Sequence, residues 1–98
     1  MSLPLIINPE AEHDLDEAKA WLNRQRTGLG GDFLECVEEA LDQIRQWPKL
    51  SRKVFLELRR KLIRRFSYGI FYRIDDDQIT VVAVDHGKRD PRGWQKRA

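Results

Sequence analysis

Residues 68–87 read YGIFYRIDDDQITVVAVDHG, and this stretch decides the fold. Apolar side chains recur at every second position of residues 68–75, which predicts a strand. The side that carries them comprises Tyr68, Ile70, Tyr72 and Ile74. Three consecutive aspartates, Asp75–Asp77, form the sharpest turn signal of the chain. The strand expected over residues 78–87 is apolar on both faces until Asp85 and His86, as expected of a central strand. The stretch therefore predicts a β-hairpin.

The amino-terminal half predicts a short strand followed by a helix. The apolar run Leu3–Ile7 suits a strand, and Asn8-Pro9 then supplies an N-cap and a first helical residue. An apolar stripe, widened by Trp21, continues this helix to about Arg26, where the glycine-rich residues 27–31 end it.

A second helix is expected to begin near Asp32, with Glu35 completing a capping box, and to end at Trp47-Pro48. With Leu58–Phe66 as a further strand, the element order is β-α-α-β-β-β. The 98 residues fit a single domain over residues 1–98. We expect an α+β, two-layer domain, in which a twisted, mainly antiparallel sheet carries the N-terminal helical hairpin on one face.

The charges are divided unequally along the chain. Residues 1–42 hold ten acidic and three basic residues, a formal net charge of −7, whereas residues 43–98 hold six acidic and fifteen basic residues, a net charge of +9. The basic half is also the half that predicts the sheet. A basic sheet favours a polyanion or an acidic protein as its partner, while the acidic helices would repel a polyanion.

Six basic residues concentrate on two neighbouring predicted strands: Arg59, Arg60, Lys61, Arg64, Arg65 and Arg73. Alternation places Arg60 and Arg64 on one face and the other three of the first strand on the opposite face, but does not decide which face is free. Guanidinium groups bind phosphates and carboxylates alike. We therefore expect either a docking surface for an anionic partner or a solvated edge strand whose charges oppose aggregation.

A second candidate site lies at the end of the last strand, where residues 85–92 read DHGKRDPR. A histidine at a strand end beside Lys88 and Arg89 suits general acid/base chemistry, and a partly exposed structural role suits His86 equally. Alternation directs Asp85 to the opposite face, so its carboxylate cannot orient the imidazole directly.

Other chemistry is not indicated. The sequence has no CxxC, HExxH or phosphate-binding loop motif, so we expect neither a metal site nor a cofactor. The single cysteine, Cys36, excludes an intrachain disulfide and fits a buried position in a reducing cytoplasm. No apolar run approaches the length of a membrane span, so we expect a cytoplasmic protein without a membrane partner. The oligomeric state stays open.

Motifs along almost the whole chain, from Asn8 to Trp94, occur in an order and spacing that resemble the RelE/ParE superfamily of toxins. In chain order they are Gly28-Leu29-Gly30 before Phe33-Leu34, Ile44, Pro48, Arg64–Ile74, Val81–Val84, His86–Pro91 and Trp94. These toxins belong to type II toxin–antitoxin, or plasmid stabilisation, modules. The resemblance implies the fold expected above, and a cognate antitoxin whose acidic, partly disordered segment folds across the toxin.

The resemblance also implies two alternative targets. RelE-like members cleave mRNA in the ribosomal A site, whereas ParE-like members poison DNA gyrase. In a nuclease, Arg65 and Arg89 would stabilise negative charge at the scissile phosphate and His86 would move the proton. The surface for the target or the antitoxin would comprise Arg59, Arg60, Lys61, Arg64, Arg65, Arg73, Lys88, Arg89 and Trp94.

Two departures from the nuclease pattern favour gyrase. The position after Tyr68, where RelE-like nucleases place a catalytic arginine, is Gly69, and no tyrosine follows Tyr72. The Arg-Asp-Pro motif before Trp94 is more similar to the ParE-like group. Growth arrest through gyrase inhibition is therefore the preferred expectation, with ribosome-dependent mRNA cleavage as the alternative.

Overall fold

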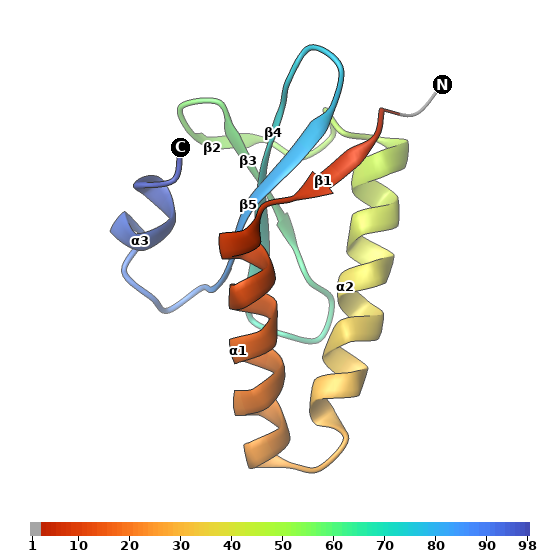
Figure 1. Cartoon of the computed structure of the whole chain (residues 1–98), viewed down its shortest axis with the longest axis vertical. Helices are drawn as coiled ribbons and strands as arrows, with labels where there is room; N and C mark the ends of the chain where they lie inside the picture. Colours follow the sequence, from red (N-terminus) through yellow and green to blue (C-terminus); the bar gives the residue numbers. More distant parts are fainter. Residues whose placement is uncertain (1–2) are drawn as a thin grey trace.

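The computed structural model describes residues 3–98, which form one five-stranded sheet with helices on both faces (Figure 1). In chain order the elements are β1 (Leu5–Ile7), α1 (Pro9–Gln25), α2 (Leu29–Gln46), β2 (Lys53–Phe55), β3 (Leu58–Leu62), β4 (Tyr68–Ile74), β5 (Ile79–His86) and α3 (Arg92–Gln95). The strand order is β1-β5-β4-β3-β2, in which β1 runs parallel to β5 and all other pairs are antiparallel. The α+β fold and its helical hairpin are confirmed, and β2 and α3 are additions to the predicted order.

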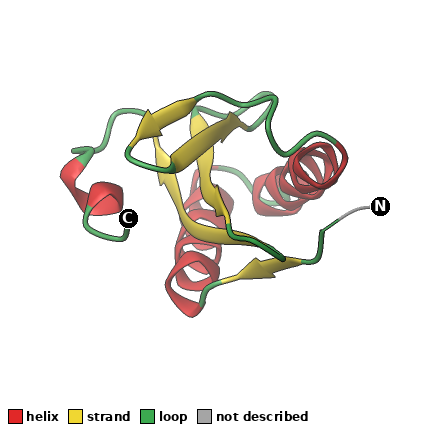
Figure 2. Cartoon of the chain, turned by 90° about the horizontal axis from the view of Figure 1, so that it is seen from above, coloured by secondary structure: helices red, strands yellow, loops and turns green. Residues whose placement is uncertain are grey.

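The hairpin of α1 and α2 covers one face of the twisted sheet, whereas α3 lies on the other side (Figure 2). The main core forms between the hairpin and the sheet, and its largest fully buried side chains include Phe33 from α2 and Tyr72 from β4. Tyr72 also donates a hydrogen bond from its hydroxyl to the Pro48 carbonyl at 2.7 Å, which ties the end of α2 to the sheet. Burial of this apolar face supplies most of the free energy of folding.

The outer face, opposite the hairpin, carries a second cluster: Leu58, Phe71, Val82, Ala83 and Trp94. The predicted alternation in β4 is confirmed, because Phe71 lies on this face while Ile70 and Tyr72 lie in the main core. A bulge sets the register of β5, since Phe71 pairs with Ala83 but Tyr72 pairs with Val81. The indole of Trp94 stacks on Phe71 with ring centroids 4.1 Å apart, which holds α3 against the sheet.

The helix starts differ in how well the sequence predicted them. The extended Asn8 precedes α1 and Pro9 is its first residue, as expected, but the Asn8 side chain makes no capping hydrogen bond. The predicted start of α2 at Asp32 is wrong, because the helix begins at Leu29 after Gly28, whose φ is +91°.

The glycines of this connection serve the approach of two helices as well as the turn. A Cβ on Gly30 would lie 2.7 Å from the Lys19 carbonyl oxygen of α1, and the Gly30 amide donates a hydrogen bond to Asn23 at 2.8 Å. Only glycine permits this close contact of α2 with α1. The glycine-rich residues 27–31, which the sequence predicted to end the first helix, are therefore partly helical, because Leu29 already belongs to α2.

The strand predicted over Leu58–Phe66 is too long, since β3 ends at Leu62. Ile63 is buried and its amide donates to the Tyr68 carbonyl at 2.9 Å, so the chain reverses within residues 63–68. Arg65 adopts a φ of +74° in this turn. The alternation expected for Arg64 and Arg65 therefore does not apply. Over residues 3–98, no helix is both long and apolar enough to cross a membrane.

Candidate functional site: a groove between the first helix and the C-terminal segment

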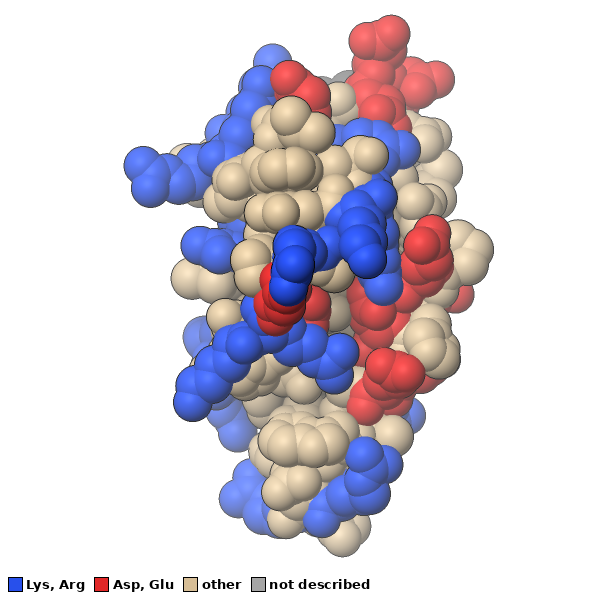
Figure 3. All heavy atoms as spheres, turned by 90° about the vertical axis from the view of Figure 1, so that its left-hand side faces the viewer, with Lys and Arg blue, Asp and Glu red and all other residues tan. Residues whose placement is uncertain are grey.

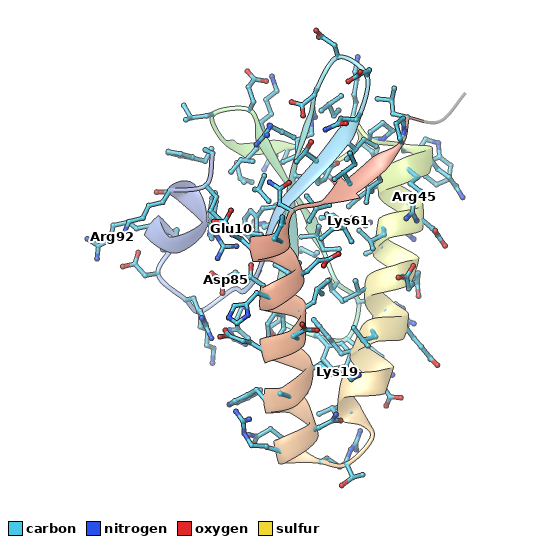
Figure 4. The ribbon with its side chains drawn as sticks, in the orientation of Figure 1. Glu10, Lys19, Arg45, Lys61, Asp85 and Arg92 are labelled. Atoms are coloured by element: carbon cyan, nitrogen blue, oxygen red, sulfur yellow. The ribbon has the colours of Figure 1, made fainter. Side chains whose placement is uncertain are left out.

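An open groove of about 1070 Å³ lies between α1, the end of β5 and the C-terminal segment, defined here as residues 87–98. In Figure 4 the Asp85 side chain lies between α1 and α3, and Arg92 points outward from α3. From α1 and the sheet, the groove is lined by Asp14, Trp21, Tyr68 and His86, among others.

Tyr68 and His86 form the floor of the groove. Their rings meet edge to face with centroids 5.1 Å apart, because the two residues are directly paired across β4 and β5. The Lys88 amide donates a hydrogen bond to Nδ1 of His86 at 3.0 Å. Because Nδ1 accepts this bond, the proton of a neutral His86 imidazole is assigned to Nε2, which is then a hydrogen-bond donor.

Asp85 points away from His86, as the sequence predicted. It pairs with Gly69 rather than Tyr68, and its Oδ1 accepts only the backbone amide of His86, at 2.8 Å. Arg89 approaches the same oxygen at 3.5 Å. Burial raises the pKa of the Asp85 carboxyl above its ordinary value, and the hydrogen bond and the arginine only partly oppose this.

The raised pKa predicts a pH-dependent effect of Asp85→Asn. A carboxyl whose folded-state pKa is raised stabilises the fold below its unfolded pKa, and this contribution is lost as the pH rises through the folded-state pKa. Thermal melts of the two proteins should therefore diverge from acidic to neutral pH, with the asparagine variant gaining in relative Tm. A constant difference across that range would contradict the assignment.

A bidentate ion pair joins the C-terminal segment to α1. Arg97 donates to both carboxylate oxygens of Asp14, with Nη2 3.2 Å from Oδ1, and its Nη1 also donates to the Val82 carbonyl at 3.1 Å. Asp14 accepts the Val84 amide at 2.9 Å as well. The hydrogen bond to Asp14 raises the pKa of Arg97.

This arrangement compensates for the short first strand. The pairing of β1 with β5 extends only to Ile7 and Val81. The Val82 carbonyl and the Val84 amide, which follow in β5, therefore have no partner in β1. Asp14 and Arg97 supply the missing hydrogen bonds, which protects the edge of β5 and fixes one wall of the groove.

The basic residues predicted to bind a target or an antitoxin are divided between the two faces of the sheet. Arg60 lies on the outer face, where its side chain crosses Gly69, and a Cβ on Gly69 would lie 3.0 Å from Arg60 Cγ. Arg59 lies on the hairpin side and donates to the Lys49 and Ser51 carbonyls at 3.2 and 2.7 Å. The alternation predicted for Arg59 and Arg60 is therefore confirmed, and whether these residues bind a target or an antitoxin stays a prediction.

Two further members of that set, Arg64 and Arg73, pair with carboxylates. Arg64 forms a two-point contact with Glu39 of α2 at 3.1 and 3.2 Å, and this hydrogen bond lowers the pKa of the Glu39 carboxyl. Arg73 pairs with Asp75 at 3.1 Å on its own hairpin. Lys61, beside Ile63 and Arg64, lines a small hollow of about 180 Å³ next to α2.

The side chains of the three residues proposed for nuclease chemistry have different partners. Arg65 lies over Phe66 and approaches Asp32 of α2 at 3.8 Å, whereas Arg89 approaches Asp85. The Arg89 amide donates to the His86 carbonyl at 3.0 Å, but among residues 3–98 no side-chain hydrogen bond or ion pair joins any two of Arg65, His86 and Arg89. His86 and Arg89 do line the same groove, and Arg65 does not.

Several groove residues escaped the sequence reasoning. Trp21 was expected to widen the buried stripe of α1, but its side chain is 47% exposed and lines the groove. Asp14 and Arg97 are 83 positions apart, and only the fold brings them together. The one available signal was the position of Trp21, which directly precedes Leu22 and so lies outside the buried positions of α1, Ala11, Ala18 and Leu22.

The comparison with protein families matches the chain over residues 5–91 to the family described as the ParE toxin of the type II toxin–antitoxin system parDE. A search of curated protein sequences finds no match.

Three solved structures are similar in fold. The chromosomal ParDE system from P. aeruginosa is 15% identical with a TM-score of 0.68, covering 87% of this chain and 96% of that one. The RelBE2 toxin–antitoxin complex from Mycobacterium tuberculosis is 21% identical with a TM-score of 0.60, covering 88% and 99%. A mutant of E. coli toxin RelE in the free state is 14% identical with a TM-score of 0.73, covering 100% and 95%.

The TM-scores of these three structures support the fold. The family match spans most of the chain. The chain belongs to the ParE toxin family of type II toxin–antitoxin systems.

Proposed function

We propose that this toxin arrests growth by inhibiting DNA gyrase and is neutralised by its cognate antitoxin. The family description, the ParE toxin of parDE, supports the ParE-like branch. The observation that carries the proposal is the dispersal of the candidate nuclease residues, because Arg65 contacts α2 while His86 and Arg89 lie at the groove.

Phosphodiester cleavage needs a proton-transfer group and cationic groups at the same phosphate, within hydrogen-bond reach. In this chain the Lys88 amide already occupies Nδ1 of His86, so only Nε2 is left for proton transfer. The position where a nuclease would carry an arginine is Gly69, and the Arg60 side chain occupies the space above it. This geometry favours a binding toxin over a hydrolytic one.

One observation keeps mRNA cleavage as the second candidate. Tyr68, His86 and Arg89 line one groove, and a phenol, an imidazole and a guanidinium are groups that serve proton transfer and charge stabilisation. If the chain is a ribosome-dependent endoribonuclease, His86→Ala should lower the cleavage rate by roughly 10²–10⁴-fold.

The test places both targets beside the same protein. Antitoxin-free toxin is added to a gyrase supercoiling reaction and, separately, to ribosomes programmed with mRNA. We expect loss of supercoiling with trapped gyrase–DNA cleavage complexes and intact mRNA, and no change on His86→Ala. Codon-aligned mRNA cuts with normal gyrase activity, abolished by His86→Ala, would replace the proposal with the nuclease alternative.

A further inference from the structure

We infer that the groove between α1 and the C-terminal segment is a seat for a peptide segment of the antitoxin, one that carries two or three carboxylates around an apolar anchor. This inference rests on the chain's being the toxin of a toxin–antitoxin module, and not on which target the toxin attacks. It places the docking site away from the basic strands that the sequence suggested, because the charges of those strands are dispersed.

The groove carries cations that the fold leaves free. Six basic and four acidic residues line it. Three of the acidic residues pair with an arginine: Asp14 with Arg97, Asp85 with Arg89 and Asp90 with Arg92. The fourth, Glu17, lies 2.9 Å from the imidazole of His13. Within the described chain, Arg24, Lys88 and Lys96 form no ion pair. The charge available to a partner is therefore positive.

These free cations come from both walls of the groove. Arg24 stands on the last turn of α1, whereas Lys88 and Lys96 belong to the C-terminal segment. A segment lying in the groove would therefore meet cations along both sides. Acidic side chains spaced along a peptide can satisfy both sets.

Between the walls, the groove offers an apolar and hydrogen-bonding floor. The Trp21 indole is 47% exposed although it belongs to a residue type that usually contributes large buried area. The phenol of Tyr68 and the imidazole of His86 line the same groove, and each combines an apolar ring with polar atoms. Amphipathic aromatic groups of this kind form the centres of protein interfaces, where an apolar side chain of the partner is buried.

The mixed charge of the groove favours a peptide over a nucleic acid. Duplex DNA carries one negative charge per about 1.7 Å, and its binding needs a continuous basic surface. Here an acidic band on α1 borders the basic C-terminal segment (Figure 3), and Asp14 and Glu17 line the α1 wall. A regular row of phosphates would meet Glu17, which pairs with no lysine or arginine of the described chain, whereas a peptide can place each of its acidic residues opposite a cation.

The size of the groove agrees with a peptide segment. Small-molecule pockets range over about 300–1000 Å³ and enclose most of their ligand. This groove measures about 1070 Å³ and is open along one side, so it would leave a small ligand largely solvated. An extended or helical segment can instead lie along it.

The experiment measures binding of full-length cognate antitoxin, isolated by its rescue of cells that express this chain. The groove variant combines Arg24→Glu, Lys88→Glu and Lys96→Glu, and a second variant is Trp21→Ala. The matched control reverses Lys49 and Arg52, exposed cations outside the groove. Calorimetry at roughly 50 and 300 mM NaCl gives the affinity and its salt dependence.

We expect each groove variant to lower the affinity by at least about tenfold, and the control by less than about twofold. The wild-type affinity should fall with salt, and the charge-reversed groove should lose that dependence. Equal losses in groove and control variants, or no loss in either, would overturn the inference. So would tight binding of an RNA of about 12 nucleotides that the groove variant abolishes while antitoxin binding persists.

Failure of the inference can be told apart from failure of the proposed function. Gyrase supercoiling with the wild-type toxin alone is measured in parallel. Groove-dependent antitoxin binding without gyrase inhibition would refute the gyrase target and support the docking site. Gyrase inhibition with unchanged antitoxin binding by the groove variants would support the gyrase target and refute the docking site.

Discussion

Replacing Phe33 by alanine is expected to lower the free energy of unfolding by about 3–5 kcal/mol. The Phe33 side chain is fully buried between α2 and the sheet. Its ring meets Phe66 and Tyr68 edge to face, with centroids 5.2 and 5.0 Å away. The substitution removes these aromatic contacts and leaves a cavity that the surrounding core cannot fully close.

Urea denaturation followed by circular dichroism would measure this loss. Leu50→Ala is the control, because that side chain is 78% exposed and should change stability by no more than about 0.5 kcal/mol. Phe33→Leu keeps most of the apolar volume and should cost less than the alanine variant. A loss below about 1 kcal/mol for Phe33→Ala would show that Phe33 is not the centre of the core.

Periodicity and turn chemistry were enough to predict most of the fold. Apolar alternation identified β4, and the aspartate run identified the hairpin to β5, because these signals are local. The start of α1 at Asn8-Pro9 followed from the capping preferences of those residues. The short β2 was missed since three residues carry no measurable period, and its neighbours decide its conformation.

The site was harder to predict than the fold. Charge counting grouped the basic residues around β3, but their directions depend on where the chain turns after Leu62 and on which carboxylates α2 presents. The groove depends on contacts between distant segments, above all Asp14 with Arg97. A single sequence holds no local signal for such pairs, so the free cations of the groove could be identified only once the ion pairs were known.

Replacing Trp94 by alanine is expected to release the C-terminal segment from the sheet while the main core stays folded. The side chain stacks on Phe71 and meets Phe55 edge to face at 6.1 Å, and it is 9% exposed. Truncating a buried tryptophan costs about 3–5 kcal/mol in a closed core. A terminal segment can avoid that full cost by detaching, so the loss should be local rather than global.

Hydrogen exchange distinguishes a local loss from a global one. The amides of Gln95, Lys96 and Arg97, which donate within the last turn, should exchange about 100-fold faster in Trp94→Ala, the equivalent of about 3 kcal/mol. Amides of β4 and β5 should keep most of their protection. Trp47→Ala is the matched control, because Trp47 is 57% exposed and its loss should leave α3 unchanged.

The same variant tests how the groove is built. Release of residues 87–98 removes the wall that holds Lys88 and Lys96, so antitoxin affinity should fall in Trp94→Ala although none of the free cations is altered. Arg97→Ala should act in the same direction, since it breaks the attachment of this wall to Asp14. Unchanged exchange at residues 95–97 in Trp94→Ala would mean that the Arg97–Asp14 pair alone positions the wall, and Arg97→Ala would then carry the whole effect.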